Sequence, residues 1–94
     1  MSQAEMKRYQ VLCHDSRQVV QAQLTKVSPA GAELVTHGGH GAPMFAVKSK
    51  IYLEILDEKT GKTEQVYVRL AKAELHQRHW VYVVRWEELP ALIA

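Results

Sequence analysis

The chain has 94 residues, of which 47% are apolar and 23% charged, and its formal net charge is only +2. A chain of this length forms one small domain that buries roughly 60–65% of its unfolded surface, so little material is left for a deep catalytic cavity. The small charge, with both signs interspersed, disfavours nucleic acid as a partner, because nucleic-acid modules usually carry a clustered basic surplus. We expect a single soluble domain over residues 1–94, with residues 1–7 as a frayed leader.

Cysteine usage and hydropathy indicate the compartment. The chain has one cysteine, Cys13, which cannot form a disulfide within the chain and therefore favours a reducing environment. The N-terminal stretch MSQAEMKRYQ lacks the apolar run of a secretory signal, and no apolar run approaches the roughly 20 residues that span a bilayer. The sequence predicts a cytoplasmic protein that does not insert into a membrane.

Alternation of apolar and polar residues is the main signal for secondary structure. Such alternation marks half-buried strands, and clusters of Gly, Pro, Asp and Ser separate them. Six regularly spaced strands with almost no helix predict an all-β fold, most simply a small six-stranded antiparallel barrel, since closing the sheet removes its exposed edges. The predicted strands cover residues 9–14, 18–27, 32–36, 51–56, 66–71 and 80–86.

The connections after the third strand carry three further predictions. Residues 58–62 (EKTGK) predict a hairpin turn with Gly61 at positive φ. The polar segment 73–79 (AELHQRH) fits either a loose turn or one helical turn. Residues 87–93 predict a short C-terminal helical turn, with the two glutamates at its start complementing its dipole.

The segment 37–47 breaks the alternation with three glycines and a proline, so we expect a loop there. Its apolar residues Met44, Phe45 and Val47 allow two interpretations. In the first, the loop is an exposed surface that faces a protein partner. In the second, these residues plug one end of the barrel.

A tight turn is predicted within residues 26–35 (KVSPAGAELV), between two apolar runs. Pro29 pre-sets the φ wanted at the second position of a β-turn, and Gly31 permits positive φ or the close approach of another backbone. The Ser28 hydroxyl can hydrogen-bond to neighbouring backbone and fix the turn. These residues are sufficient for a purely structural turn between two strands.

The stretch VSPAGAELV, a strand followed by a Ser-x-x-Gly turn and a second alternating strand, resembles the centre of PilZ domains. These are six-stranded bacterial β-barrels, many of which bind the second messenger cyclic di-GMP. The order of the later strands (KIYLEILDE, EQVYVRLAKA and HWVYVVRW) is similar to the same family, and the resemblance covers residues 8 to about 90. It implies a non-catalytic regulatory or adaptor module in bacterial signalling, with cyclic di-GMP as the candidate ligand and no cofactor.

The ligand-binding signature of that family is only partly present. It joins Arg-x-x-x-Arg before the first strand to Asp/Asn-x-Ser-x-x-Gly at the turn; Lys26 takes the acidic or amide position, and Ala4 stands four residues before Arg8. A lysine cannot accept the hydrogen bonds that a guanine donates to a carboxylate or amide. We therefore expect weak or absent cyclic di-GMP binding and action through a protein partner. The residual site consists of Arg8, Lys26, Ser28 and Gly31.

Four of the five histidines form two pairs with the same spacing, His37/His40 and His76/His79. Imidazoles bind Zn, Ni or Cu, and four of them suffice for a tetrahedral site. If the pairs met in space, a metal would staple this small domain, which is our alternative function. Structural zinc sites usually include cysteine thiolates, however, and both pairs fall in polar segments. We therefore expect no metal.

Catalytic constellations have little support. Ser28, His37 and Asp57 provide the residue types of a hydrolytic triad, but no local signature surrounds them. Cys13 and His14 are adjacent on a predicted strand, so their side chains point to opposite faces. The sequence therefore predicts no enzymatic activity.

Trp80, Tyr82 and Trp86 alternate along one face of the last predicted strand. They form either part of the barrel core, with one tryptophan at the rim, or an aromatic platform for single-stranded nucleic acid. Arg78 and Arg85 are the only basic residues nearby, and two glutamates follow them. This balance of charge favours the core.

Overall fold

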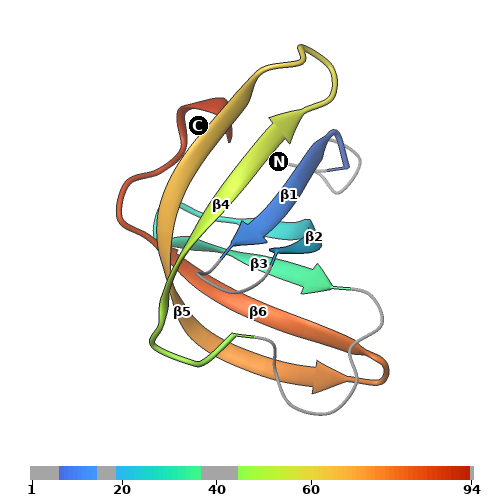
Figure 1. The fold of residues 1–94 in the computed structure, drawn as a ribbon, viewed down its shortest axis with the longest axis vertical. Helices are drawn as coiled ribbons and strands as arrows, with labels where there is room; N and C mark the ends of the chain where they lie inside the picture. Colours follow the sequence, from blue (N-terminus) through green and yellow to red (C-terminus); the bar gives the residue numbers. More distant parts are fainter. Residues whose placement is uncertain (1–6, 15–18, 37–44, 94) are drawn as a thin grey trace.

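The structure is a computed structural model that describes residues 7–14, 19–36 and 45–93. These residues form a closed antiparallel barrel with the strand order β1-β2-β3-β6-β5-β4, which confirms the predicted all-β barrel (Figure 1). Within these ranges, no helical segment has the length and apolar character needed to cross a bilayer. The elements are β1 (Tyr9–His14), β2 (Val19–Val27), β3 (Gly31–Thr36), β4 (Lys50–Asp57), β5 (Thr63–His76), β6 (His79–Trp86) and the 3-10 turn η1 (Ala91–Ile93).

Alternate residues of each strand fill the interior of the barrel. In β6 the inward side chains are Trp80, Tyr82 and Val84, while Val81 and Val83 on the outer face are half-buried. A barrel of so few strands is narrow enough for side chains to fill it completely. The largest buried apolar side chains are Tyr82, Phe45, Leu24, Leu34, Leu53, Ile55, Leu70, Val11, Val68 and Val84.

The longest strand, β5, differs from the prediction. Segment 73–79 is neither a loose turn nor a helical turn, because β5 continues to His76 and joins β6 through a tight turn at Gln77, whose φ is 58°. A β-bulge between Leu70 and Lys72 shifts the phase of the side chains. Before the bulge, the side chains of even-numbered residues point inward. After it, odd-numbered residues lie opposite the inward-pointing residues of β6, for example Ala73 opposite Tyr82. The alternation is therefore interrupted, which hid the second half of the strand.

The C-terminal segment forms the predicted short helical turn, but it does not start as predicted. No acidic residue lies in the first turn of η1, so Glu87 and Glu88 do not complement a helix dipole. Instead, the Glu64 carboxylate of β5 accepts hydrogen bonds from the backbone N–H groups of Ala91 (3.1 Å) and Leu92 (2.9 Å). N–H groups at a helix start lack intrahelical partners, and here the folded barrel supplies the acceptor from another strand.

The two interpretations of segment 37–47 can be compared at its C-terminal end, since residues 37–44, with Met44, lie outside the described residues. Phe45 is 2% exposed, and its ring packs edge-on against Tyr82 with 5.8 Å between ring centroids. Phe45 is therefore part of the core and not of an exposed partner-facing surface. Val47 is 48% exposed.

The backbones of β3 and β6 come very close at Gly31. A Cβ atom built on Gly31 would lie 2.0 Å from the carbonyl oxygen of Val84, a separation that real side chains do not tolerate. The sequence left open whether Gly31 serves positive φ or a close backbone approach. The structure shows that close approach is the reason, since Gly61 is the only described glycine with positive φ.

We expect Gly31→Ala to lower the free energy of unfolding by about 3 kcal/mol, because β3 and β6 must separate to admit the methyl group. Gly61→Ala is the matched control. Nothing lies within 4 Å of an added Cβ at Gly61, so only backbone strain of about 1 kcal/mol at φ 75° applies. Urea unfolding followed by tryptophan fluorescence measures both values. Equal losses in the two variants would contradict a steric role for Gly31.

Candidate functional site

The turn between β2 and β3 is held by the backbone and hydroxyl of Ser28. The Ser28 N–H donates to the Gly31 carbonyl (2.8 Å), and the Gly31 N–H donates to the Ser28 carbonyl (3.3 Å). Ser28 Oγ also accepts from the N–H groups of Ala30 (3.3 Å) and Gly31 (3.2 Å). The Ser-x-x-Gly spacing therefore shapes a tight turn, as turn chemistry predicted.

Trp86, the last residue of β6, ties this turn to the end of the chain. Its indole N–H donates to the Ser28 carbonyl (3.0 Å), and its backbone N–H donates to the Ala30 carbonyl (3.1 Å). The segment that follows, which we call the C-terminal tail (residues 87–93), thus leaves the barrel from a fixed point beside the turn.

A hollow of about 440 Å³, which we call the turn hollow, lies beside these residues. It includes three of the four predicted ligand residues, Lys26, Ser28 and Gly31, together with Val83 and Arg85 of β6. Most of its lining is apolar, and Lys26 and Arg85 are its only cations among the described residues. An apolar surface with cations beside it is the type of lining that binds nucleotides. This hollow, however, offers only one guanidinium group for a forked contact with a phosphate or a guanine.

Glu33 offsets part of the positive charge in the turn hollow. Its carboxylate lies 3.8 Å from Lys26 Nζ and accepts a 2.9 Å hydrogen bond from the Thr25 hydroxyl. The Lys26 side chain is 78% exposed, and a pair so well solvated contributes little to stability. Glu33 also lines the hollow, where its negative charge opposes the approach of a phosphate.

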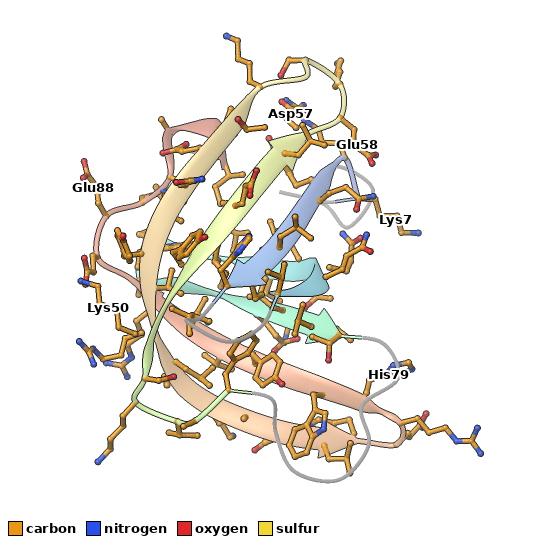
Figure 2. All side chains as sticks on the ribbon, in the orientation of Figure 1. Lys7, Lys50, Asp57, Glu58, His79 and Glu88 are labelled. Atoms are coloured by element: carbon orange, nitrogen blue, oxygen red, sulfur yellow. The ribbon has the colours of Figure 1, made fainter. Side chains whose placement is uncertain are left out.

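Arg8 does not line the turn hollow. Its guanidinium forms a forked pair with Asp57 at the end of β4, with 3.1 Å from Nε to Oδ1 and 2.7 Å from Nη2 to Oδ2. Asp57, at one end of the barrel in Figure 2, is 2% exposed. The hydrogen bonds from Arg8 hold the pKa of the Asp57 carboxyl below its ordinary range, against the opposing effect of burial. The predicted ligand residues are therefore divided between two places.

Arg85 is the residue of the turn hollow that sequence reasoning did not select. In the sheet it lies opposite Gly31 of β3 and opposite Arg69 of β5. Alternation along β6 indicates that Arg85 lies on the same outer face as Val83. The sequence contains no other indication of where Arg85 lies. Its position beside the turn follows from the cross-strand register, which the sequence does not contain.

Only one of the two predicted histidine pairs, His76/His79, lies among the described residues. His37 and His40 lie outside the described residues. His76 and His79 face each other across the β5–β6 hairpin, and His76 Nε2 lies 2.9 Å from a carboxylate oxygen of Glu74. Figure 2 shows His79 at the end of the barrel opposite Asp57. Among the described residues, no three His, Cys, Asp or Glu side chains lie close enough together to hold a metal.

The described catalytic candidates make other contacts. Cys13 is completely buried inside the barrel, whereas His14 lies on the outer face, stacked on Tyr52 with 4.4 Å between ring centroids. Ser28 Oγ accepts a hydrogen bond from the Gly31 N–H within the turn, and the Asp57 carboxylate accepts one from Arg8. His37, the remaining member of the suggested triad, lies outside the described residues.

The aromatic residues of β6 belong mainly to the core. Trp80 and Tyr82 are 7% and 1% exposed, so they offer no stacking platform for nucleic-acid bases. Trp86 is half-buried at the rim and bonds to the turn. The prediction of a core with one tryptophan at the rim is confirmed.

Comparison of the chain with protein-family models, with curated proteins and with solved structures finds no match.

Burial raises the pKa of the Cys13 thiol to about 12, so the reactive thiolate is scarce at neutral pH. We expect Ellman's reagent to label Cys13 in the folded chain at least about 100-fold more slowly than in the urea-unfolded chain. The absorbance of the released thiol measures both rates. A folded-state rate that matches the unfolded one would contradict a closed barrel around Cys13.

Because the pKa of Asp57 is depressed in the folded state, its stabilising contribution is complete above the pKa of unfolded aspartate, about 3.9. That contribution is lost as the pH falls through the lower folded-state pKa. Urea midpoints measured from about pH 5 to pH 2 should therefore decline less steeply in Asp57→Asn than in the unaltered chain. Arg8→Gln should flatten the same part of the curve, and the double variant should add nothing further. Identical slopes in the unaltered chain and Asp57→Asn would show that the pair does not stabilise the fold.

Proposed function

We propose that this chain is a non-catalytic, cytoplasmic regulatory or adaptor module of the PilZ kind, which acts through a protein partner and binds cyclic di-GMP weakly or not at all. Three features support the proposal: the Ser-x-x-Gly turn, the order of the strands and the closure of the sheet into a barrel. In this proposal the turn hollow is the remnant of a ligand site.

The observation that carries the proposal is the separation of the cations. A ligand with two phosphates and two guanines is held best by forked guanidinium groups that converge on it. The turn hollow has Arg85 and Lys26, while the guanidinium of Arg8 donates two hydrogen bonds to Asp57. Each missing fork or reversed hydrogen-bonding role costs on the order of 1–3 kcal/mol, so two such losses weaken binding by roughly 30-fold or more.

Recruiting Arg8 to a ligand is unfavourable. Asp57 is buried, and withdrawal of the guanidinium would leave its carboxylate without a charged partner. Two uncharged donors to that carboxylate would remain, the N–H of Lys59 (3.0 Å) and the side chain of Thr60. The pair therefore keeps Arg8 in a structural role, which agrees with a ligand site that has lost its function.

Calorimetric titration with cyclic di-GMP tests the proposal. We expect the unaltered chain to give no heat of binding, or a Kd above about 100 µM. The double variant Ala4→Arg, Lys26→Asp restores both parts of the family signature and should bind at least about ten-fold more tightly, because it regains a fork and an acceptor.

Two outcomes would contradict the proposal. Micromolar or tighter binding by the unaltered chain, abolished by Arg8→Ala, would show that the ligand site is functional. A double variant that gains no affinity, while its circular dichroism shows an intact barrel, would count against the resemblance to the family.

A further inference from the structure

One stretch of β5 has a strand neighbour on one side only. β4 pairs with β5 from Thr63 to Arg69, but β6 pairs with β5 only from Val68 onward, because β6 ends at Trp86. On the unpaired side of residues 63–67, the chain leaves the sheet as the C-terminal tail, which runs beside β5 in Figure 1. We call residues 63–67 the open edge of β5.

The hydrogen bonds toward β4 show which backbone groups face the unpaired side. The Lys62 carbonyl and the Leu70 N–H both bond across to the β4 side. Backbone groups in an antiparallel pair alternate in direction along the strand. In this part of β5, the N–H and C=O groups of even-numbered residues therefore point toward β4, and those of odd-numbered residues point away from it. Gln65 and Tyr67 therefore present their N–H and C=O groups on the unpaired side. The last pair of the β5–β6 ladder is Val68 with Trp86, so the Tyr67 carbonyl faces the Glu87 N–H at the end of that ladder. The backbone groups of Gln65 lie beyond the ladder and make no backbone hydrogen bond to the tail within the described chain.

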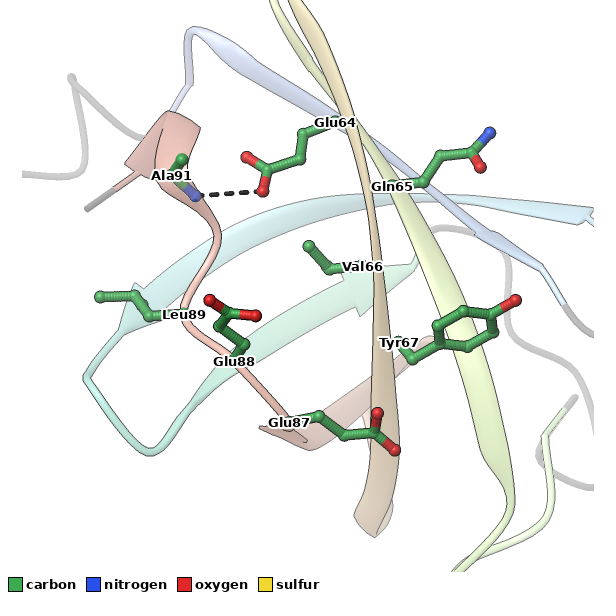
Figure 3. Close-up of a pocket in the computed structure, with 8 residues that line it drawn as sticks. All are labelled: Glu64, Gln65, Val66, Tyr67, Glu87, Glu88, Leu89 and Ala91. Atoms are coloured by element: carbon green, nitrogen blue, oxygen red, sulfur yellow. Dashed lines mark hydrogen bonds between the residues drawn. The ribbon is translucent and has the colours of Figure 1, made fainter.

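A groove of about 310 Å³ separates the open edge from the tail, a volume within the range of ligand pockets (Figure 3). Half-buried Val66 and Leu89 supply its apolar part. Both ends of the tail are fixed, since Trp86 bonds to the β2–β3 turn and the Leu92 carbonyl accepts a 3.1 Å hydrogen bond from the Tyr9 hydroxyl. The groove is therefore preformed, and little free energy is needed to order it around a ligand.

The groove is acidic. Figure 3 shows the carboxylates of Glu64, Glu87 and Glu88 spaced along the gap between β5 and the tail. Glu64 accepts the two N–H groups of η1, and a carboxylate oxygen of Glu87 lies 3.0 Å from Lys50 Nζ. Glu88 is exposed and makes no ion pair with the residues that the structure describes. Three carboxylates against one ammonium favour a cationic ligand.

We infer that this groove binds an extended, basic peptide segment of a partner protein by strand addition along the open edge of β5. The peptide backbone pairs with the N–H and C=O groups of Gln65 and with the N–H group of Tyr67, and a Lys or Arg side chain meets Glu88. In this mode, main-chain hydrogen bonds supply affinity and alternate side chains supply specificity. The inference goes beyond the adaptor role proposed above, because it concerns a surface other than the turn hollow and holds whether or not cyclic di-GMP binds.

The test is an NMR titration of the isotope-labelled full chain with a synthetic peptide of alternating Lys and Val residues. We expect amide shifts concentrated at Gln65, Tyr67 and the tail, and at least about ten-fold weaker binding of the matched peptide with Glu in place of Lys. Glu88→Gln should weaken binding of the Lys peptide by about three- to five-fold. Glu58→Gln, which removes an exposed carboxylate between β4 and β5, is the matched control and should leave the affinity unchanged.

Backbone N-methylation separates strand addition from simple charge attraction. Methylating one alternate set of peptide N–H groups blocks the donors that face β5, whereas methylating the other set leaves them available. One methylated peptide should lose binding and the other should keep it. Equal binding by both, shifts outside the groove, or no binding of the Lys peptide would each overturn the inference. None of these results depends on cyclic di-GMP, so failure here is distinguishable from failure of the proposed function.

Discussion

The contact between Gly31 and the Val84 carbonyl is the constraint on which the rest of the barrel depends. It joins β3 to β6, strands that are far apart in the chain, at a separation that excludes any side chain at residue 31. At that separation the turn after β2 lies within hydrogen-bonding reach of Trp86. The turn hollow, the end of β6 and the start of the C-terminal tail are therefore positioned by one backbone approach.

The lengths of the strands create the second feature of the molecule. A closed sheet hides its edges, but β6 ends at Trp86, opposite Val68, and does not reach the start of β5, so residues 63–67 have no strand neighbour on one side. The tail lies opposite that side and is fastened by Glu64 and Tyr9. Carboxylates beside an exposed edge repel the same edge of a second copy and attract a strand of opposite charge. The arrangement discourages self-association while leaving an edge that a basic segment can use.

By itself the sequence determined the all-β class, the antiparallel barrel, the hairpin at Gly61 and the tight turn at Ser28. These features are local, since strand alternation and turn chemistry are encoded in neighbouring residues. The same local rule failed in β5, where the bulge after Leu70 reverses the alternation and made the strand look like a polar turn. It failed again at Glu87 and Glu88, because the acceptor for η1 comes from another strand.

Only the tertiary structure decided which charges meet. Arg8 bonds to Asp57, 49 residues away, and so lies apart from the turn whose ligand it was predicted to share. Arg85 enters the turn hollow because it lies opposite Gly31 in the closed sheet. The groove beside β5 exists because β6 stops at Trp86. Each of these relations joins residues distant in the chain, and cross-strand register is set by the packing of the whole barrel and not by any local pattern.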